Sequence, residues 1–211
     1  MNHPVNPWTK IPVDEYEAHM SHPAIGQHQL LNSLTKKYLN LVKPLNCLFL
    51  GVAGGNGLEH VDNNMVKSVS AVDINREYLD KTYERYHRVI KSLTLLNIDI
   101  SENTGTICRS DFIWAALILE YTGIENTLLF SKNNITDDGQ LIITIQSNNG
   151  VSAISDTGIK SIQNLGHVFK MIDKALLISR ATAMGFNLID SEENLLPNGK
   201  SFITVRLKNI T

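Results

Sequence analysis

Short apolar runs alternate with longer segments of helical spacing along most of the chain from residue 46 onward. Apolar runs of this kind, bounded by polar or glycine-rich segments, are typical of buried strands. Five of them predict strands at residues 47–50, 68–72, 93–98, 112–117 and 141–145. Strands that alternate with helices indicate a mostly parallel sheet covered on both faces.

The segments between these runs predict helices. Leu79, Tyr83, Tyr86 and Ile90 recur on one helical face, and Asn75 is placed to cap that helix. Helices are also predicted at residues 58–65 and at residues 124–133, the second before an Asp-Asp-Gly turn at 137–139. A long helix is predicted from the spacing of Leu165, Val168, Phe169, Ile172 and Leu176. Gly185 is placed to end it.

The end of the chain breaks the alternation. Two apolar runs, at residues 186–189 and 202–207, are joined by a polar connection that contains Pro197-Asn198-Gly199, a turn sequence. No helix fits between them, so they are predicted to pair antiparallel. The expected fold is an α/β, Rossmann-like three-layer sandwich, with a seven-stranded, mostly parallel sheet and a C-terminal antiparallel hairpin.

The first part of the chain has a different pattern. Prolines near the start disfavour regular structure, a short helix is predicted at residues 14–20, and a second helical stripe runs over residues 30–41 until Pro44. We therefore divide the chain into an N-terminal helical segment, residues 1–43, and a Rossmann-like domain, residues 44–211.

Composition narrows the possible partners. The chain has 211 residues and a formal net charge of −2, with 19 basic and 21 acidic side chains and no basic run. A nucleic-acid partner is therefore not expected. The chain has neither an apolar signal-peptide core nor an 18-residue apolar stretch, and Cys47 and Cys108 form no CxxC pair. A cytoplasmic protein without a membrane partner is expected, and no metal site is predicted.

Candidate chemistry lies directly after the first three strands, where open α/β sheets bind ligands. Small residues after the first strand, Gly51, Ala53, Gly55, Asn56 and Gly57, allow a sharp turn and close approach of a ligand to the backbone. Asp73 follows the second strand and can accept hydrogen bonds from a ribose diol. Asp99 follows the third strand and can accept from an adenine amino group, with Ile98 and Ile100 beside the ring.

These motifs resemble those of the class I S-adenosylmethionine-dependent methyltransferases of the small-molecule type. The resemblance covers residues 48–146 and rests on LFLGVAGGNG at 48–57, AVDI at 71–74, NID at 97–99 and DFIWAALILEY at 111–121. It implies S-adenosylmethionine as the cofactor and methyl transfer to a small molecule, which the sequence does not identify. It also implies that Ile74 and Ala115 contact the cofactor and that the N-terminal segment is a lid.

Two positions depart from the family pattern. The family has an acidic residue where this chain has Gly51, and a glycine where it has Ala53. That acid holds the amino group of the methionine moiety, so another acid is needed for this role. Glu59, Asp14 and Glu15 are the candidates.

The residues that bind the methyl acceptor are less clearly indicated by the sequence than those that bind the cofactor. Tyr16 and His19 belong to the predicted lid, Glu120 and Tyr121 follow the fourth strand, Gln146 follows the fifth, and His167 begins the long helix. We expect Tyr16, His19, Tyr121, Gln146 and His167 to line the acceptor pocket, with His19 or His167 able to act as a base. Methyl transfer from a sulfonium depends mainly on positioning, so no catalytic residue is assigned.

Two other functions compete with this interpretation. A nicotinamide-dependent oxidoreductase also has a glycine-rich turn and an acid near the second strand, but the GxGxxG spacing is missing from residues 51–57. A non-catalytic module that binds an adenosyl ligand is the second alternative, supported by Gly51 and Ala53.

Overall fold

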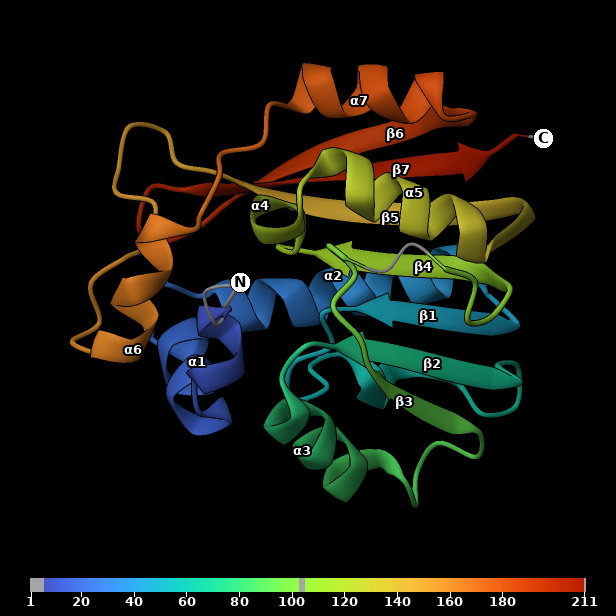
Figure 1. The fold of residues 1–211 in the computed structure, drawn as a ribbon, viewed down its shortest axis with the longest axis horizontal. Coiled ribbons are helices and arrows are strands. Elements are labelled where there is room, and N and C mark those ends of the chain that lie inside the picture. Colours follow the sequence, from blue (N-terminus) through green and yellow to red (C-terminus); the bar gives the residue numbers. More distant parts are fainter. Residues whose placement is uncertain (1–5, 103–104, 211) are drawn as a thin grey trace.

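The computed structural model describes residues 6–102 and 105–210, which form one seven-stranded sheet (Figure 1). Its strands are β1 (Asn46–Leu50), β2 (Ser68–Asp73), β3 (Leu93–Asn97), β4 (Ser110–Ala116), β5 (Ile135–Ser147), β6 (Phe186–Leu195) and β7 (Ser201–Asn209). Their order is β3-β2-β1-β4-β5-β7-β6. Strand β7 runs antiparallel to β5 and to β6, and every other pair is parallel. The predicted seven-stranded sheet with a terminal antiparallel hairpin is confirmed.

Helices cover both faces of this sheet, as the three-layer prediction requires. The α-helices are α1 (Val13–Ser21), α2 (Gln27–Val42), α3 (Arg76–Tyr86), α4 (Leu119–Thr122), α5 (Ile124–Asn134), α6 (Lys160–Gln163) and α7 (Lys174–Ala183). Three short 3-10 helices are η1 (Pro7–Lys10), η2 (Leu58–His60) and η3 (Asn164–His167). In Figure 1, α5 and α7 lie in front of the sheet and α2 lies behind it.

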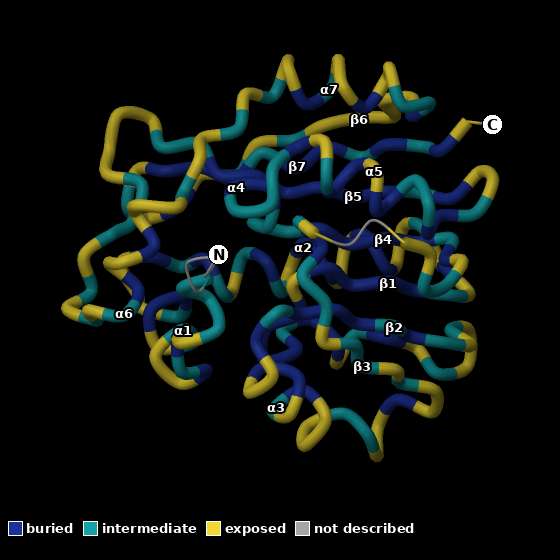
Figure 2. The backbone as a smooth tube through the Cα atoms, in the orientation of Figure 1, coloured by how far each residue is buried: buried dark blue, intermediate teal, exposed yellow. Residues whose placement is uncertain are grey.

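The core has two halves because side chains alternate between the two faces of each strand. Phe49 of β1 packs in a cluster with Leu34 of α2, whereas its neighbour Leu50 packs in a second cluster with Leu128 of α5. Burying a side chain of this size contributes about 1.5–3 kcal/mol. Figure 2 shows the central strands buried and β6 exposed along most of its length.

Helix α3 begins where it was predicted to begin. The Asn75 side chain accepts a hydrogen bond from the backbone N–H of Glu77 at 2.9 Å, which caps the first turn. Leu79 is buried, but Tyr83, which was predicted on the same buried stripe, is 57% exposed, and Ile90 is buried beyond the end of the helix. The buried face of α3 is therefore shorter than predicted.

The helix predicted at residues 58–65 is wrong beyond its first turn. Only η2 forms there, and the chain then turns at Asp62, whose side chain accepts from the Asn64 N–H at 2.9 Å. The side-chain amide of Asn63 donates to the carbonyl of Val89, three residues after the end of α3, at 2.8 Å. Asp and Asn side chains that bond the nearby backbone compete with helix formation.

The long helix predicted through residues 165–176 is also interrupted. Its first part is α6 and η3, and α7 begins only after Asp173, whose carboxylate accepts from the Leu176 N–H at 2.7 Å and caps a new helix. The intervening backbone N–H of Lys170 donates to the Glu120 carbonyl at 2.9 Å. Gly185, with φ of +81°, ends α7 as predicted.

The Asp-Asp-Gly turn predicted at 137–139 lies inside the first part of β5 instead. Asp138 has φ of +61°, and the pairing of β4 with β5 changes register between Ser110 and Phe112. The segment is therefore an irregularity in the strand: β4 advances by two residues from Ser110 to Phe112 while β5 advances by five from Ile135 to Gln140, so three extra residues of β5 are accommodated without ending the ladder.

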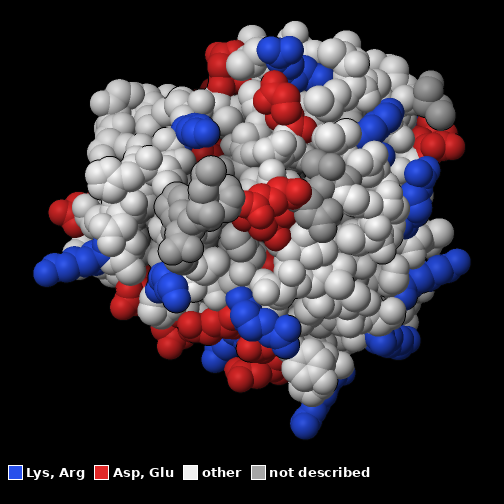
Figure 3. All heavy atoms as spheres, viewed as in Figure 1, with Lys and Arg blue, Asp and Glu red and all other residues white. Residues whose placement is uncertain are grey.

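Figure 3 shows basic and acidic side chains interspersed over one face of the molecule. Pairs such as Arg76–Asp80 and Lys81–Glu84 on α3 account for part of this mixture. Across residues 6–102 and 105–210, no helix has the length and apolar character needed to cross a membrane. Within the same ranges, no group of three His, Cys, Asp or Glu side chains is arranged to hold a metal ion.

Candidate functional site

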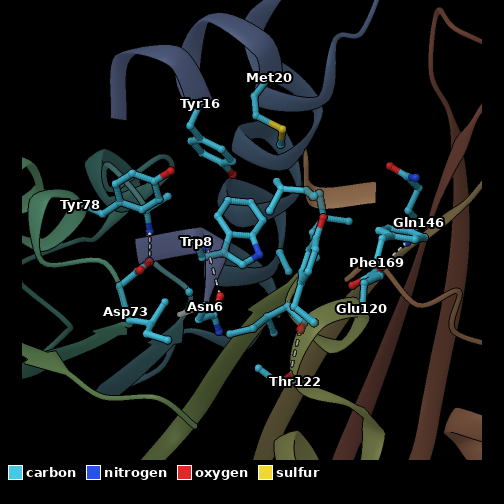
Figure 4. Close-up of a pocket in the computed structure, with 18 of the residues that line it drawn as sticks. Asn6, Trp8, Tyr16, Met20, Asp73, Tyr78, Glu120, Thr122, Gln146 and Phe169 are labelled. Atoms are coloured by element: carbon cyan, nitrogen blue, oxygen red, sulfur yellow. Dashed lines mark hydrogen bonds between the residues drawn. The ribbon is translucent and has the colours of Figure 1, made fainter. Parts of the chain in front are cut away.

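A cavity lies at the carboxyl ends of the parallel strands, beneath α1 (Figure 4). Asp73 and Tyr78 stand on one side of it, Glu120 and Gln146 on the other, and Trp8 lies between them. The cavity spans the position between β1 and β4 where the strand order reverses, which is the usual ligand site of an open α/β sheet.

The turn after β1 supplies Gly51 and Ala53 to the cavity wall. The backbone N–H groups of Gly51 and Val52 both donate to the Val72 carbonyl, at 2.9 and 3.1 Å, so they hold the turn against β2. Ala53 has φ of +49°, a left-handed conformation that glycine adopts more easily. Gly51 has φ of +69°, and a Cβ there would lie 3.0 Å from Cδ1 of Ile118, so a side chain at this position would be strained and the tip of Ile118 would have to shift.

The other three small residues of the turn lie outside the cavity lining. A Cβ on Gly55 would lie 2.5 Å from the Tyr86 ring, and one on Gly57 would lie 2.7 Å from Thr35. Asn56 donates from its side chain to the His28 carbonyl at 2.9 Å. These three residues therefore pack the turn against α2 and α3. The α-helix predicted to follow this turn is also missing, because only the single turn η2 follows.

Asp73 reaches the cavity from the end of β2. Its carboxylate accepts from the Ala53 N–H at 2.9 Å and from the Asn75 N–H at 2.8 Å. Burial raises the pKa of Asp73 to about 6, although these backbone hydrogen bonds act in the opposite direction. Each carboxylate oxygen can accept a further hydrogen bond, so the group remains available to a ligand. Its neighbour Ile74 also lines the cavity.

The loop after β3 brings Ile98, Asp99 and Ile100 to the same end of the cavity as Asp73. Asp99 accepts from the Ser101 N–H at 2.9 Å, which holds its carboxylate close to the backbone. Ala115, predicted to contact the cofactor, is fully buried in the sheet core and is not part of the cavity lining. Asp73, Ile74, Asp99 and Ile100 are thus brought together as predicted.

Aromatic rings occupy the middle of the cavity. Trp8 packs edge-on against Tyr121 with ring centroids 4.9 Å apart and against Tyr16 at 5.9 Å. Phe169 extends this cluster on the far side of Tyr121, at 5.9 Å. Asn75 fixes the backbone of η1 by donating to the Trp8 carbonyl at 2.8 Å. Tyr16 and Tyr121 were predicted here, whereas Trp8 was missed because its proline-containing segment was interpreted as irregular.

Three buried polar atoms of the cavity have no hydrogen-bond partner among the described residues. They are Nε1 of Trp8, the hydroxyl of Tyr78 and Oε2 of Glu120. The other Glu120 oxygen accepts from the Gln146 N–H at 2.8 Å, and burial raises the pKa of Glu120 to about 7. Leaving a buried polar group unpaired costs about 1–3 kcal/mol, so these three atoms are candidate contacts for a bound ligand or for water.

Gln146 lies at the end of the cavity away from Asp73. Its side-chain amide donates to Oδ1 of Asn148 at 2.6 Å and to the Ala153 carbonyl at 2.9 Å, and its oxygen accepts from Gln27 at 2.8 Å. This network ties α2 to the loop after β5. Gln146 therefore acts as a fixed part of the cavity wall.

Two basic side chains lie at the same end. His19 of α1 shares a 2.7 Å hydrogen bond with the Thr157 hydroxyl, and burial, together with the positive charges of Lys200 and His22, lowers its pKa to about 4. Lys200 donates to the Ala153 carbonyl at 2.6 Å, and burial lowers its pKa to about 8. His19 is therefore neutral and Lys200 mostly charged near pH 7. Lys200 was not predicted as a site residue.

The remaining predicted residues lie elsewhere. His167 is exposed in η3, outside the cavity lining. Among the acids expected to compensate for Gly51, Asp14 is exposed and Glu15 bonds the Ser161 hydroxyl. Glu59 accepts from the Gly57 N–H at 2.9 Å, within the turn. Among the described residues that line the cavity, Glu120 is the acid between Asp73 and Gln146.

No protein-family model matches the chain, and no curated protein matches it in sequence. Solved structures do match. The N-methyltransferase NodS from Bradyrhizobium japonicum has a TM-score of 0.63 at 16% identity, with 91% of this chain and 99% of that chain covered. Magnesium protoporphyrin IX methyltransferase from Synechocystis, with bound S-adenosylmethionine, has a TM-score of 0.65 at 10% identity, covering 99% and 100%.

One structural neighbour has a different activity. The cyclase SpnF has a TM-score of 0.63 at 11% identity, with 86% of this chain and 80% of that chain covered. The strand order and the antiparallel β7 agree with the fold inferred from the motifs. This chain therefore has the Rossmann-like fold of the class I S-adenosylmethionine-dependent methyltransferases.

Proposed function

We propose that this protein transfers the methyl group of S-adenosylmethionine to a small molecule. The observation that carries the proposal is the set of unpartnered buried polar atoms on Trp8, Tyr78 and Glu120, which lie in one cavity at the carboxyl edge of the sheet. The S-adenosylmethionine molecule combines an adenosine, a cationic centre and an amino acid, so it offers donors, acceptors and positive charge to such a set.

The adenosine moiety is assigned to the end of the cavity formed by β2 and β3. Asp73 keeps acceptor capacity beyond its two backbone contacts and would bind the ribose hydroxyls. Asp99 would accept from the adenine amino group, and Ile98 and Ile100 would contact the ring. The backbone at Gly51 and Ala53 would border the ribose.

Glu120 is assigned to the amino group of the methionine moiety. It would take the role of the acidic residue that the family has at the position of Gly51. Its Oε2 is buried without a partner, and its other oxygen is held by the Gln146 N–H, so the carboxylate is fixed in orientation. A nearby ammonium would favour the charged form and lower the pKa of this carboxyl from about 7.

The aromatic cluster is assigned to the reacting centre. Ring faces of Trp8, Tyr16 and Tyr121 attract a cation at short range and exclude water from it. When bound, the cofactor would supply an activated methyl group, which the acceptor's lone pair would take up as the carbon–sulfur bond broke and left its electron pair on sulfur. The residues of the chain contribute by holding the acceptor in line.

The N-terminal segment is proposed as a lid over this centre. Trp8, Tyr16, His19 and Met20 line the cavity, and the ion pair between Glu17 of α1 and Arg85 of α3 joins the segment to the domain at 2.5 Å. Residues 1–5 of the proposed segment lie outside the described residues. Acceptor entry would require this segment to move.

Calorimetry with S-adenosylmethionine, S-adenosylhomocysteine and NADH tests the cofactor assignment. Binding of both adenosyl ligands without NADH is expected, followed by mass-spectrometric detection of a methylated product from a small-molecule library. Binding of NADH alone would contradict the proposal. Binding of S-adenosylhomocysteine without turnover on any acceptor would favour a non-catalytic module. The cyclase SpnF shows that this fold also occurs in a protein that is not named as a methyltransferase.

A further inference from the structure

We propose that the acceptor carries a carboxylate and that the ammonium group of Lys200 binds it at the β5–β7 end of the cavity. That the bound carboxylate is a methyl acceptor rests on the proposed function. The anion site itself depends only on the placement of Lys200 and on the composition of the surrounding wall.

The sheet topology brings Lys200 to the ligand-binding edge. Ser147 at the end of β5 pairs with Ser201 at the start of the antiparallel β7, so the residue before Ser201 lies at the carboxyl edge of the parallel strands. Lys200 is only 2% exposed and lines the cavity. Its backbone N–H donates to Oδ1 of Asn198 at 3.2 Å, which helps to fix the turn that presents the side chain.

The ammonium of Lys200 has fewer partners than its chemistry demands. It has three donors, and the contact found for it among the described residues is the Ala153 carbonyl at 2.6 Å. Lys132 offers a contrast within the same chain, because its ammonium donates to three oxygens, those of Gly185, Asn209 and Ile210. Lys132 is fully bonded as a structural lysine is, whereas Lys200 keeps two donors.

The charge of Lys200 is also uncompensated. No carboxylate in residues 6–102 or 105–210 forms an ion pair with it. Its neighbour His19 is neutral near pH 7, and Glu120, the other acid at this side of the cavity, forms no ion pair with it among the described residues. A buried cation without a counterion is costly, so an anionic ligand would relieve a cost that the folded chain carries.

Besides the polar side chains of His19 and Gln146, the cavity has an apolar part. Ile154, Ile162, Leu165 and Phe169 line the cavity, and the first three belong to one hydrophobic cluster with Tyr121. One ammonium matches a single negative charge, and the apolar wall matches a hydrocarbon or aromatic body. The chemical class is therefore a small monocarboxylate with an apolar body.

Competition between matched ligands tests this inference. The probes are a panel of aryl and alkyl monocarboxylates, each paired with its primary amide of the same shape, titrated into the protein with and without S-adenosylhomocysteine. We expect at least one carboxylate to bind about tenfold more tightly than its amide. Lys200→Gln should abolish that preference while it keeps a donor for the Ala153 carbonyl. Lys160→Gln, an exposed lysine of α6, should leave the preference unchanged.

Three results would overturn the anion site: no carboxylate binds the wild-type protein, amides bind as tightly as carboxylates, or Lys200→Gln retains the preference. Thermal unfolding of both variants shows whether the comparison is made on folded protein, and Lys200→Met provides a second neutral variant. Failure of S-adenosylhomocysteine to bind, with the carboxylate preference intact, would contradict the methyltransferase proposal and leave the anion site standing.

Discussion

Asp73 has both a structural and a proposed ligand-binding role, because the same carboxylate holds the turn after β1 and faces the cavity. Its two hydrogen bonds, from the N–H groups of Ala53 and Asn75, use about half of the acceptor positions of a carboxylate. A substitution here therefore changes the turn as well as the ribose contact, and the two effects must be separated by measurement.

Asp73→Ala is expected to lower S-adenosylhomocysteine affinity by about tenfold or more, on the order of 1.4 kcal/mol, because the ribose hydroxyls lose a charged partner. Calorimetry measures the affinity, and circular dichroism checks that the variant is folded. Asp80→Ala, on the exposed side of α3, serves as the control. Unchanged affinity in folded Asp73→Ala would show that the ribose assignment is wrong.

Glu120→Gln addresses the methionine end of the ligand. We expect it to weaken S-adenosylhomocysteine by about tenfold while leaving 5′-methylthioadenosine unchanged, because the second ligand has no amino group to bind. The ratio of the two affinities is the measured quantity. Equal losses for both ligands would indicate a general disturbance of the cavity and contradict the assignment of Glu120 to the amino group.

Individual site residues differ in how far the sequence could predict them. Asp73 and Asp99 were predicted from their places at the ends of strands, although each also bonds the nearby backbone. Lys200 was missed because it belongs to a turn between two edge strands, and only the pairing of β5 with β7 brings it to the cavity. Glu120 was noticed after the fourth strand, but its full burial depends on packing that no local pattern reveals.

At the level of elements, the turn at residues 51–57 is held in place by close packing against α2 and α3. Gly57 has φ of +93°, and a Cβ there would lie 2.7 Å from Thr35 of α2. The turn and α2 therefore approach each other more closely than a side chain allows. This contact links the N-terminal helices to the edge of the cavity.

Gly57→Ala is expected to destabilise the fold by about 1–3 kcal/mol, since it combines an unfavourable φ with a collision against α2. Gly150→Ala is the matched control, because Gly150 also has positive φ, +85°, but no atom lies within 4 Å of the added Cβ. Urea denaturation measures both. Equal losses would mean that the collision with Thr35 has no energetic consequence.

The elements themselves were predicted well where a strand is buried and less well where polar side chains interrupt a helical pattern. The terminal hairpin followed from Pro197-Asn198-Gly199 and the short connection. The helices at residues 58–65 and 165–176 failed at Asp62 and Asp173, each of which bonds a nearby backbone N–H. Apolar spacing does not distinguish such an acid from one that stays in solvent within a continuous helix.

For the molecule as a whole, the cavity connects distant parts of the sheet. Asp73 ends β2 and Lys200 precedes β7, and four strand spacings of about 4.8 Å separate those strands, or roughly 19 Å. Ionisable groups buried along this length make folding stability depend on pH, because burial shifts their pKa values in the folded state alone.

Glu120 allows that dependence to be tested. Its folded-state pKa of about 7 lies above the ordinary 4.5, so the folded state holds more protons between these values. The unfolding free energy contributed by this group should therefore fall as pH rises from about 4.5 to about 7 and stay level above that. Glu120→Gln should lack this fall, so wild type loses stability relative to the variant as pH rises from about 4.5 to about 7, and measurements at about pH 5 and about pH 8 span most of this loss.

Urea denaturation at about pH 5 and about pH 8 measures the difference in unfolding free energy between wild type and Glu120→Gln. Glu102→Gln, at an exposed position, is the control. A difference in unfolding free energy between wild type and Glu120→Gln that stays constant with pH would contradict the raised pKa of Glu120 in the folded state. Asp73 and His19 contribute slopes of their own, but they are common to wild type and variant and cancel in the comparison.

Strand β7 follows β6 in the chain yet lies between β5 and β6 in the sheet. A nascent polypeptide that has emerged from the ribosome only as far as β6 has no place for that strand, because β6 bonds to β7. Its backbone groups stay unpaired until residues 201–209 have been synthesised and inserted. The sheet, and with it the position of the buried lysine, is thus completed only when β7 inserts between β5 and β6, and until then both of these strands have an open edge.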